Sequence, residues 1–428
     1  MSASTRQAAI IGGNRIPFAR SDGPYAQASN SDMLNAALDG LIARFSLQDE
    51  TIGEVAAGAV LKHSRDFNLT RECVLGSALS PSTPAYDVQQ ACDTGIEAAV
   101  LVANKIALGQ IESGIAGGVD TTSDPPLALD DDLRRLLLQI RRTPSAAGRL
   151  ALLSRVRPDF IVPEIPRNAE PRTGLSMGAH TAITAREWDV SRAEQDELAA
   201  ASHQHLAAAY ERGFFDDLLT PYLGLTRDQT LRPDSTVEKL AKLRPVFGDG
   251  DSATMTAGNS TPLSDGASAV LLASDEWAAE RALPVLAHLV DAQTAAVPYT
   301  HGEEGLLLAP AYAVPTLLDR NGLTLQDFDF YEIHEAFAAQ VIATLKAWED
   351  PVFCKERLGR PGPLGAIDRA KLNVNGSSLA VGHPFAATGG RIVATLAKLL
   401  AERGEGRGLI SICAAGGQGV VAILERRA

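Results

Sequence analysis

Four reactive side chains stand at predicted turns or strand ends, and the first of them is Cys92. It lies in VQQACDTGIEAAV, between a run typical of a strand (residues 85–89) and one typical of a helix (96 onward). A thiol at the first turn of a helix meets the positive end of the helix dipole, which favours the thiolate and lowers the cysteine pKa. The position therefore suits a nucleophile, and the alternative is a small residue packed where strand meets helix.

A histidine with the character of a general base follows in NVNGSSLAVGHPFAATGG, residues 373–390. His383 stands among glycines and precedes Pro384, so we expect it on a turn. The small residues around it allow backbone to approach a ligand closely. Such a histidine can accept a proton from a thiol, while the alternative is a turn histidine bonded to backbone.

A second thiol, Cys413, ends a predicted strand before a glycine-rich turn in SICAAGGQG, residues 411–419. Backbone N–H groups in such a turn can bind an oxyanion. A thiol that keeps its proton near neutral pH can act as an acid rather than as a nucleophile.

The fourth reactive residue is His334, in FDFYEIHEAFAAQ. Its His-Glu pair invites the H-E-x-x-H zinc motif, but Ala338 occupies the fifth position, so we expect no metal site. The sequence instead predicts a strand over residues 330–333 that ends at His334 and a helix that starts at Glu335. A polar residue thus stands again at the carboxyl end of a strand, where binding sites gather.

Alternating strand and helix signals around these residues predict an α/β fold with mostly parallel strands. A segment rich in Arg, Asp and Pro, residues 121–250, interrupts the pattern and is expected to be an insertion. The predicted strands cover residues 8–12, 52–60, 111–120, 252–260 and 267–274, and the predicted helices cover 31–43 (capped at Ser31), 96–108 and 192–212.

The last third of the chain repeats the plan of the first. HPFAATGGRIVATLAKLL leads into GRGLISICAAGGQG, as CDTGIEAAVLVANKIAL leads into GQIESGIAGGVD. Each copy has a reactive residue, a glycine, a helix, a glycine break and a strand that ends in Gly-Gly. We infer an internal duplication, whose two halves would bring Cys92 and His383 to one shared site.

Composition limits the function classes. The net charge of −13 argues against nonspecific nucleic-acid binding, and no apolar run approaches the roughly 18 residues of a membrane-spanning helix. The sequence has no secretory signal, phosphate-loop, G-x-S-x-G or dinucleotide-binding pattern. The cysteines show no zinc-ligand spacing, so we expect reduced thiols in a cytoplasm; they are residues 73, 92, 354 and 413.

Taken in order, these motifs resemble the thiolase family nearly from end to end. The similarity is greatest to degradative 3-ketoacyl-CoA thiolases, in the β-subunit branch of the fatty-acid oxidation complexes, which carries H-E-A-F where other thiolases have N-E-A-F. Further similar stretches are IIGGNRIPF, TGLSMG, AKLRPVF, NSTPLSDGA, GHPFAATG and CAAGGQG.

The resemblance implies the thiolase fold, in which two duplicated βαβαβαββ halves form α/β/α/β/α layers with an inserted loop domain. It implies at least a homodimer. The expected boundaries are 1–120 plus 251–280 for the N-terminal half, 121–250 for the loop domain and 281–428 for the C-terminal half.

The resemblance also implies a reaction, the reversible thiolytic cleavage of 3-ketoacyl-CoA by coenzyme A in fatty-acid β-oxidation. Cys92 would be the nucleophile and His383 its base, with His334 and His383 at the enolate oxygen and Cys413 as the acid. Backbone N–H groups of Cys92 and Ala415 would form the oxyanion hole. Coenzyme A is expected as a substrate, with no further cofactor.

The implied pantetheine-binding positions come from motif matches. Where related thiolases read A-S-G, this chain reads Ser260-Thr261-Pro262, so the match at Thr261 is the loosest. The positions are Ser176, Met177, Thr261 and Phe337.

An Arg-rich stretch at residues 133–158 departs from the family pattern. Leu133, Leu136, Leu137 and Ile140 form an apolar stripe at helical spacing, flanked by arginines. Three interpretations stay open: a helix packed on the core with a solvated face, a basic patch for CoA phosphates or the acyl tail, and a docking element. The docking partner would be a membrane surface or a hydratase/dehydrogenase subunit.

Other functions compete with thiolysis. A biosynthetic acetoacetyl-CoA thiolase is the nearest, and His334 in place of Asn argues against it. A β-ketoacyl carrier-protein synthase lacks a second cysteine, so Cys413 argues against that. A noncatalytic scaffold or lipid-binding subunit would have no reason to keep Cys92, His334, His383 and Cys413 together.

Overall fold

The computed structural model describes residues 6–427, and within this range a mixed sheet of ten strands organises the chain. The strand order is β10-β11-β12-β9-β1-β8-β5-β3-β4, and β2 pairs with β8. The strands are β1 (Ala8–Arg15), β2 (Ala19–Arg20), β3 (Glu54–Ala57), β4 (Ala85–Asp87), β5 (Ser113–Asp120), β8 (Ser264–Ala273), β9 (Ala287–Ala296), β10 (Phe330–Ile333), β11 (Gly406–Ala414) and β12 (Gln418–Arg426).

Strand order confirms the duplication. If the short β2 and the separate β6–β7 hairpin are left out, the third, second, fourth, fifth and first strands of the first half lie side by side as β4-β3-β5-β8-β1. In the second half β10-β11-β12-β9 repeats that order, and a parallel bridge between Tyr331 and Leu372 occupies the place of the missing third strand. The two halves join where β1 pairs with β9 in antiparallel fashion.

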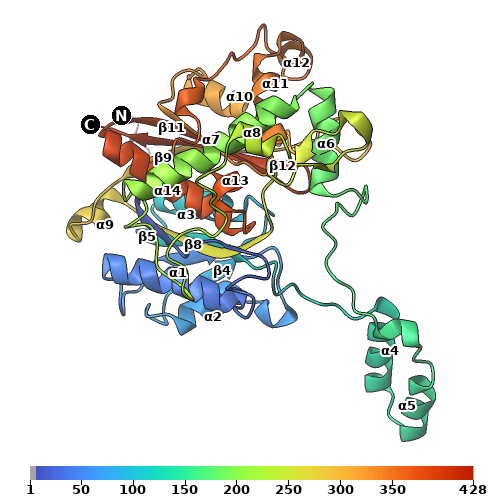
Figure 1. Cartoon of the computed structure of the whole chain (residues 1–428). Helices are drawn as coiled ribbons and strands as arrows, with labels where there is room; N and C mark the ends of the chain where they lie inside the picture. The colour runs from blue at the N-terminus through green and yellow to red at the C-terminus, as the bar shows by residue number, and fades with distance from the viewer. Residues whose placement is uncertain (1–5, 428) are drawn as a thin grey trace.

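Two equivalent helices lie between the halves, each preceding the fourth strand of its own half. They are α3 (Thr94–Ala107) and α14 (Ala387–Arg403), and Figure 1 shows them between the β9–β12 and the β5–β8 parts of the sheet. A Cβ atom added to Gly95 would lie 2.5 Å from the carbonyl oxygen of Ala386, so the backbones of the two helix starts are nearly in contact. Residues just before these helices are therefore brought together.

Other helices cover the outer faces and complete the α/β/α/β/α layers (Figure 1). The first half carries α1 (Asn30–Phe45) and α2 (Leu69–Gly76), and a short α9 (Asp275–Glu280) precedes β9. The second half carries α10 (Ala309–Asn321), α11 (Ala338–Glu349) and α12 (Pro351–Glu356). The short α13 (Ser378–Val381) is instead buried, and it packs against helix α7 (Arg192–Glu211).

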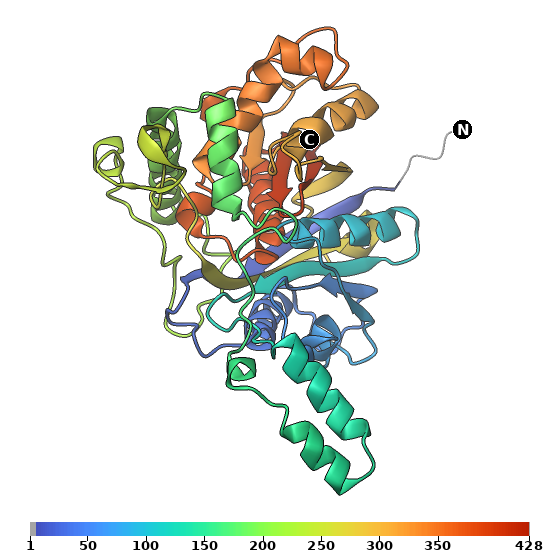
Figure 2. The same cartoon turned by 90° about the vertical axis from the view of Figure 1, so that its right-hand side faces the viewer.

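The inserted segment consists of two unlike parts. One part packs on the body and includes α6 (Met177–Glu187), α7 (Arg192–Glu211), α8 (Val237–Leu240) and the hairpin of β6 (Pro245–Phe247) with β7 (Met255–Thr256). The other is a helical hairpin of α4 (Asp131–Arg142) and α5 (Ala146–Leu153), which stands away from the body (Figures 1 and 2).

The interpretation of the stripe of residues 133–140 as a face packed on the core is wrong. Leu136 is the buried side chain of α4, and α5 buries none. Leu137 and Leu150 are 40% and 70% exposed. The helical periodicity was correct for α4, but periodicity alone does not say whether another surface covers the stripe.

The strands pair mostly in antiparallel fashion, so the prediction of mostly parallel strands is wrong; only β10–β11, β3–β4 and β3–β5 are parallel among the described strands. Many predicted element boundaries also differ from the structure, and three of them are instructive. Helix α1 begins at Asn30, because Ser29, not Ser31, accepts the Asp32 N–H as its cap. Helix α11 begins at Ala338 rather than at Glu335. Only Met255–Thr256 of the predicted strand 252–260 is a strand. Within residues 6–427, no helix is both long and apolar enough to cross a membrane.

Candidate active site

Cys92 and His383 meet where α3 and α14 begin. The Sγ atom of Cys92 lies 3.1 Å from Nε2 of His383, and Nδ1 of His383 lies 2.6 Å from Oγ1 of Thr388 on the first turn of α14. Cys92 stands two residues before the first residue of α3 and is partly accessible, while His383 is buried. The pair thus joins one residue from each half of the duplication.

Both members of the pair are neutral in the free protein. Burial, followed by the charge of Asp93, raises the pKa of Cys92 to about 12. Burial, followed by Arg391, lowers the pKa of His383 to about 3. The Cys92 thiol therefore donates to Nε2 of His383, and Nδ1–H of His383 donates to Thr388.

The expectation that the helix dipole lowers the Cys92 pKa is thus wrong for the free protein. Removing the sulfur from water costs more than the dipole returns, because desolvation penalises the charged form. Backbone N–H groups of Ala415 and Cys92 act in the opposite direction and favour the thiolate. The site is therefore built to receive negative charge without holding it at rest.

Cys413 lies near the carboxyl end of β11 and is buried. Burial, Cys92 and Asp93 raise its pKa well above the ordinary value. Cys413 is consequently a thiol that holds its proton, which is the state an acid needs.

His334 follows the last residue of β10, and its ring centroid lies 4.2 Å from that of His383. Its backbone N–H donates to the carbonyl of Ser411, which fixes it beside β11. Its Nδ1 lies 2.8 Å from Oγ of Ser378, whereas Nε2 is buried with no hydrogen-bond partner among the described residues. Burial, His383 and Arg391 lower the pKa of His334 well below the ordinary value, so this ring is neutral too.

Two carboxylates that tie the site loops together were missed from the sequence. Glu335 accepts from Oγ of Ser202 at 2.7 Å and from Nδ2 of Asn373 at 2.7 Å. Asp120 accepts the backbone N–H of Leu61 at 2.8 Å and that of Ala386 at 2.9 Å, and burial raises its pKa to about 7.

The only sequence signals for these carboxylates are their places at a strand end, Asp120 as the last residue of β5 and Glu335 two residues after β10. Glu335 belongs to the incomplete zinc motif and to the predicted helix start, and neither assigns it a role in the site. Asp120 ends GIAGGVD, a stretch that was interpreted for its glycines.

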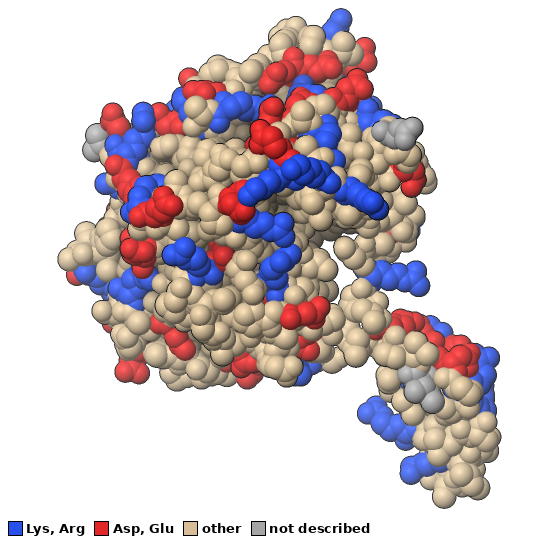
Figure 3. All heavy atoms as spheres, viewed as in Figure 1, with Lys and Arg blue, Asp and Glu red and all other residues tan. Residues whose placement is uncertain are grey.

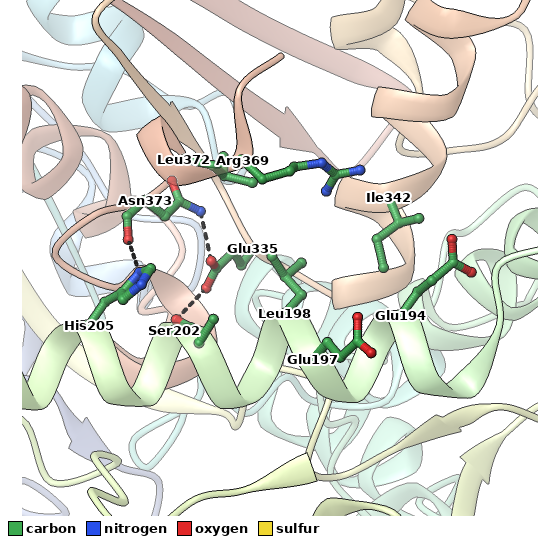
Figure 4. A pocket seen from close by; sticks show the side chains of 11 residues that line it. Glu194, Glu197, Leu198, Ser202, His205, Glu335, Ile342, Arg369, Leu372 and Asn373 are labelled. Carbon is green, nitrogen blue, oxygen red and sulfur yellow. Dashed lines mark hydrogen bonds between the residues drawn. The ribbon is translucent and has the colours of Figure 1, made fainter. Parts of the chain in front are cut away.

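Glu335 also borders a cavity of about 270 Å³ behind the site (Figure 4). Its walls come from α7, α11 and the segment around Asn373. None of the four predicted catalytic side chains lines this cavity, so it is not the place where the Cys92–His383 chemistry occurs.

The predicted CoA-binding residues lie at helix starts and beside a second cavity. Ser176 caps α6, with its Oγ accepting from Ala179, and Met177 is the first residue of α6. Phe337 precedes α11 and belongs with Met177 and Cys413 to one hydrophobic cluster.

Thr261 donates to the carbonyl of Ala336 and lines a cavity of about 220 Å³. Arg20 and Arg232 line the same cavity, and neither forms a salt bridge among residues 6–427. No residue of the hairpin contributes to it, so this cavity, not the Arg-rich stretch, supplies local positive charge beside Thr261.

Comparison with known proteins agrees with this architecture. Residues 8–276 match the thiolase N-terminal domain and residues 283–426 match the thiolase C-terminal domain. The chain is 40% identical over 423 residues to a 3-ketoacyl-CoA thiolase of Yersinia enterocolitica, covering 97% of this chain and 96% of that one. It is 40% identical over 422 residues to one of Yersinia pestis (strain Pestoides F), with the same coverage.

Solved structures match over nearly the whole chain. The acetyl-CoA acetyltransferase of Bacillus anthracis superposes with a TM-score of 0.81 at 29% identity, covering 99% of this chain and 100% of that one. Human mitochondrial 3-ketoacyl-CoA thiolase in complex with CoA superposes with a TM-score of 0.81 at 27% identity, covering 99% of each chain. The chain belongs to the thiolase family, has the thiolase fold and is an acyltransferase of that family.

Proposed function

We propose that this thiolase cleaves 3-ketoacyl-CoA with coenzyme A, giving acetyl-CoA and a shortened acyl-CoA through an acyl-Cys92 intermediate. The observation that carries the proposal is the 3.1 Å contact between Sγ of Cys92 and the neutral imidazole of His383. A neutral base beside a neutral thiol can take its proton as the sulfur attacks. The curated relatives named 3-ketoacyl-CoA thiolase support the choice of substrate.

In the first half of the reaction, Nε2 of His383 accepts the Sγ proton and the sulfur attacks C3 of the substrate. The oxygen on C3 becomes negative, and backbone N–H groups of Cys92 and Ala415 stabilise it. The influence of these two N–H groups on the Cys92 pKa supports this role. The C2–C3 bond then breaks, its electron pair passes to the acetyl-CoA enolate, and the acyl group stays on Cys92.

The enolate oxygen is stabilised by Nε2–H of His334 and by the protonated His383. Cys413 donates its proton to C2 of the enolate, which releases acetyl-CoA. In the second half, the Cys413 thiolate accepts the proton of an incoming CoA thiol, and the CoA sulfur attacks the acyl-Cys92 carbonyl. This step returns His383 and Cys92 to their starting states once His383 gives its proton to the departing sulfur.

Coenzyme A would lie along the helix starts near the site. Met177 and Phe337 offer an apolar surface to pantetheine, beside Ser176 and Thr261. The guanidinium groups of Arg20 and Arg232, which form no salt bridge among residues 6–427, suit its phosphates. Each chemical step has a side chain to perform it, so we propose no cofactor besides CoA as a substrate.

A substrate panel tests this function. Steady-state thiolysis rates on C4 and on C8 to C16 3-ketoacyl-CoAs should show activity on the longer chains. Cys92→Ala should abolish that activity, whereas Cys73→Ala, which changes a buried cysteine of helix α2 outside the site, should leave it within about twofold. Activity on C4 alone would indicate a biosynthetic acetoacetyl-CoA thiolase, and no activity at all would indicate a scaffold.

We propose further that the chain acts in the cytoplasm as a homodimer or tetramer. Its four free cysteines fit a reducing compartment. We also propose that residues 1–120 plus 251–280, 121–250 and 281–428 are the N-terminal half, the loop domain and the C-terminal half. The end of β8 and the start of β9 support the boundary near residue 281.

The α4–α5 hairpin is proposed as a docking element for an anionic membrane surface. It stands off the body with exposed Leu137, Leu150 and Leu153, and Figure 3 shows basic side chains along its flanks. Arg141 and Arg142 close α4 and form no salt bridge among the described residues. An apolar stripe flanked by arginines suits the interface of an anionic bilayer.

Charge reversal distinguishes the possible binding partners of this hairpin. Arg141→Glu together with Arg142→Glu should reduce sedimentation with anionic vesicles at least about tenfold, while the KM for CoA stays unchanged. Loss of capture by a hydratase/dehydrogenase subunit, with vesicle binding intact, would identify a partner protein instead. A raised KM for CoA would contradict docking altogether.

A further inference from the structure

Two side chains outside the predicted catalytic set meet at the inner nitrogen of His334. Oγ of Ser378, on α13, lies 2.8 Å from Nδ1 of His334. Nη2 of Arg391, on α14, donates to the same Oγ at 2.9 Å and more weakly to Oγ of Ser377 at 3.4 Å. A buried row of three polar groups thus runs from a guanidinium through a hydroxyl to an imidazole.

Hydrogen-bond chemistry fixes the direction of this row. A guanidinium can only donate, so Oγ of Ser378 accepts from Arg391. The hydroxyl proton of Ser378 has no acceptor among the described residues other than Nδ1 of His334, so it goes there. Nδ1 of His334 must then accept. Because the ring is neutral, its one N–H is on Nε2.

The Arg391 cation that starts the row is held by nearby carboxyl groups. Glu332 and Glu335 both act on Arg391, opposing the effect of its burial. The pKa of Arg391 is lowered to about 10 but stays above neutral pH, so the guanidinium is charged under ordinary conditions. Its charge also disfavours a proton on Nδ1 of His334, which reinforces the same tautomer.

The N–H on Nε2 of His334 is available to a ligand. Nε2 is buried without a hydrogen-bond partner among the described residues, and the His334 ring lies against that of His383. His383 contacts Cys92 directly. An unpartnered buried donor beside the Cys92–His383 pair is placed to bind a substrate atom.

We propose that Ser378 and Arg391 are positioning residues that hold His334 in the tautomer whose Nε2–H faces the thioester oxygen of the substrate. The proposal rests on the thiolysis mechanism above. Charge develops on that oxygen only when the C2–C3 bond breaks and the enolate forms. Acyl transfer between acyl-CoA and Cys92 places the charge on the acyl oxygen instead. The backbone N–H groups of Cys92 and Ala415 stabilise that oxygen.

The two partial reactions therefore test the proposal. Ser378→Ala should lower the single-turnover rate of 3-ketoacyl-CoA cleavage about 10- to 100-fold, approaching the loss of one oxyanion-hole donor. The same variant should exchange its acyl group between acyl-CoA and isotopically labelled CoA within about twofold of the unmodified protein. Intact exchange also shows that the variant is folded.

Matched variants isolate the hydroxyl. Ser377→Ala removes the other serine that Arg391 contacts and should leave both reactions unchanged. Ser378→Gly lacks the hydroxyl in a smaller side chain and should behave like alanine, whereas Ser378→Thr keeps it and should recover cleavage.

Equal losses in cleavage and exchange would overturn the proposal, and so would unimpaired cleavage in both Ser378→Ala and Ser378→Gly. Failure of the proposed function looks different, because the unmodified chain would then show neither cleavage nor exchange.

Discussion

Cys92 keeps its proton in the free protein, although Ala415 and its own N–H favour the thiolate. His383, 3.1 Å away, is a neutral acceptor whose Nδ1–H is held by Thr388. Proton transfer thus accompanies the attack on substrate rather than preceding it. This arrangement limits side reactions of a sulfur that is partly accessible.

The raised pKa of Cys92 has a direct consequence for its labelling by iodoacetamide. Only the thiolate reacts, so labelling at pH 7 to 8 should be slower than that of a free thiol and should keep rising from pH 9 toward 12. Peptide mass spectrometry across a pH series would measure it, with His383→Ala as a comparison. Rapid labelling independent of pH between 5 and 8 would instead reveal a thiolate–imidazolium pair.

At the scale of elements, the contact between α3 and α14 holds the two halves of the site together. The backbones approach closely at Gly95, where an added Cβ would lie 2.5 Å from the Ala386 carbonyl oxygen and 2.9 Å from the Gly390 nitrogen. Backbone atoms cannot yield as a flexible side chain does, so a larger residue must push the helices apart.

Gly95→Ala should therefore lower the free energy of unfolding by about 1 to 3 kcal/mol and reduce thiolysis more than that loss explains. Denaturant titration and steady-state rates measure the two effects. Gly362→Ala is the matched control, because nothing lies within 4 Å of its added Cβ. Full activity in Gly95→Ala would show that the helix contact does not set the Cys92–His383 distance.

Elements with strong local signals could be predicted from the sequence, whereas details set by distant contacts could not. Helix α7 lies within one residue of its prediction and β10 matches it. The cap of α1 was misplaced because Ser29 and Ser31 are equally good by type, and only the reciprocal bond with Asp32 distinguishes them.

The features of the site divide in the same way into those with a signal in the sequence and those set by distant contacts. The repeat in the sequence predicted that Cys92 and His383 share one site, because equivalent strands place equivalent residues. The sequence predicts a lowered pKa for Cys92, but the structure gives a raised one. Burial is the main cause, and the burial of a residue depends on the whole fold. Ser378 went unnoticed because its importance lies in a bond to a residue 44 positions away.

At the scale of the whole molecule, the body and the α4–α5 hairpin differ in how they are held. The body buries the two central helices between the halves of the sheet, while the hairpin projects from it (Figure 2). Leu136 is the buried side chain of α4, and α5 buries none. Although the chain is acidic, with a net charge of −13, this appendage carries exposed arginines, among them Arg141, Arg142 and Arg149. The hairpin is therefore expected to be separable from catalysis.

Replacing residues 131–153 with a short Gly-Ser linker should leave the melting temperature within a few degrees and the thiolysis rate within about twofold. The reason is that little apolar area is lost from the core. Calorimetry and the thiolysis assay check both, and binding to anionic vesicles should disappear. A large fall in the rate on 3-ketoacyl-CoA would place the hairpin in the catalytic unit.

The central claim, that Cys92 carries the acyl group, is tested most directly by mass spectrometry of the intact protein and of its peptides after mixing with 3-ketoacyl-CoA in the absence of free CoA. The mechanism predicts one added acyl group, two carbons shorter than the substrate's, on the peptide that contains Cys92, and its removal when CoA is added. Cys92→Ala should acquire no adduct. An adduct that persists in that variant, or one found on Cys413 instead, would contradict the mechanism.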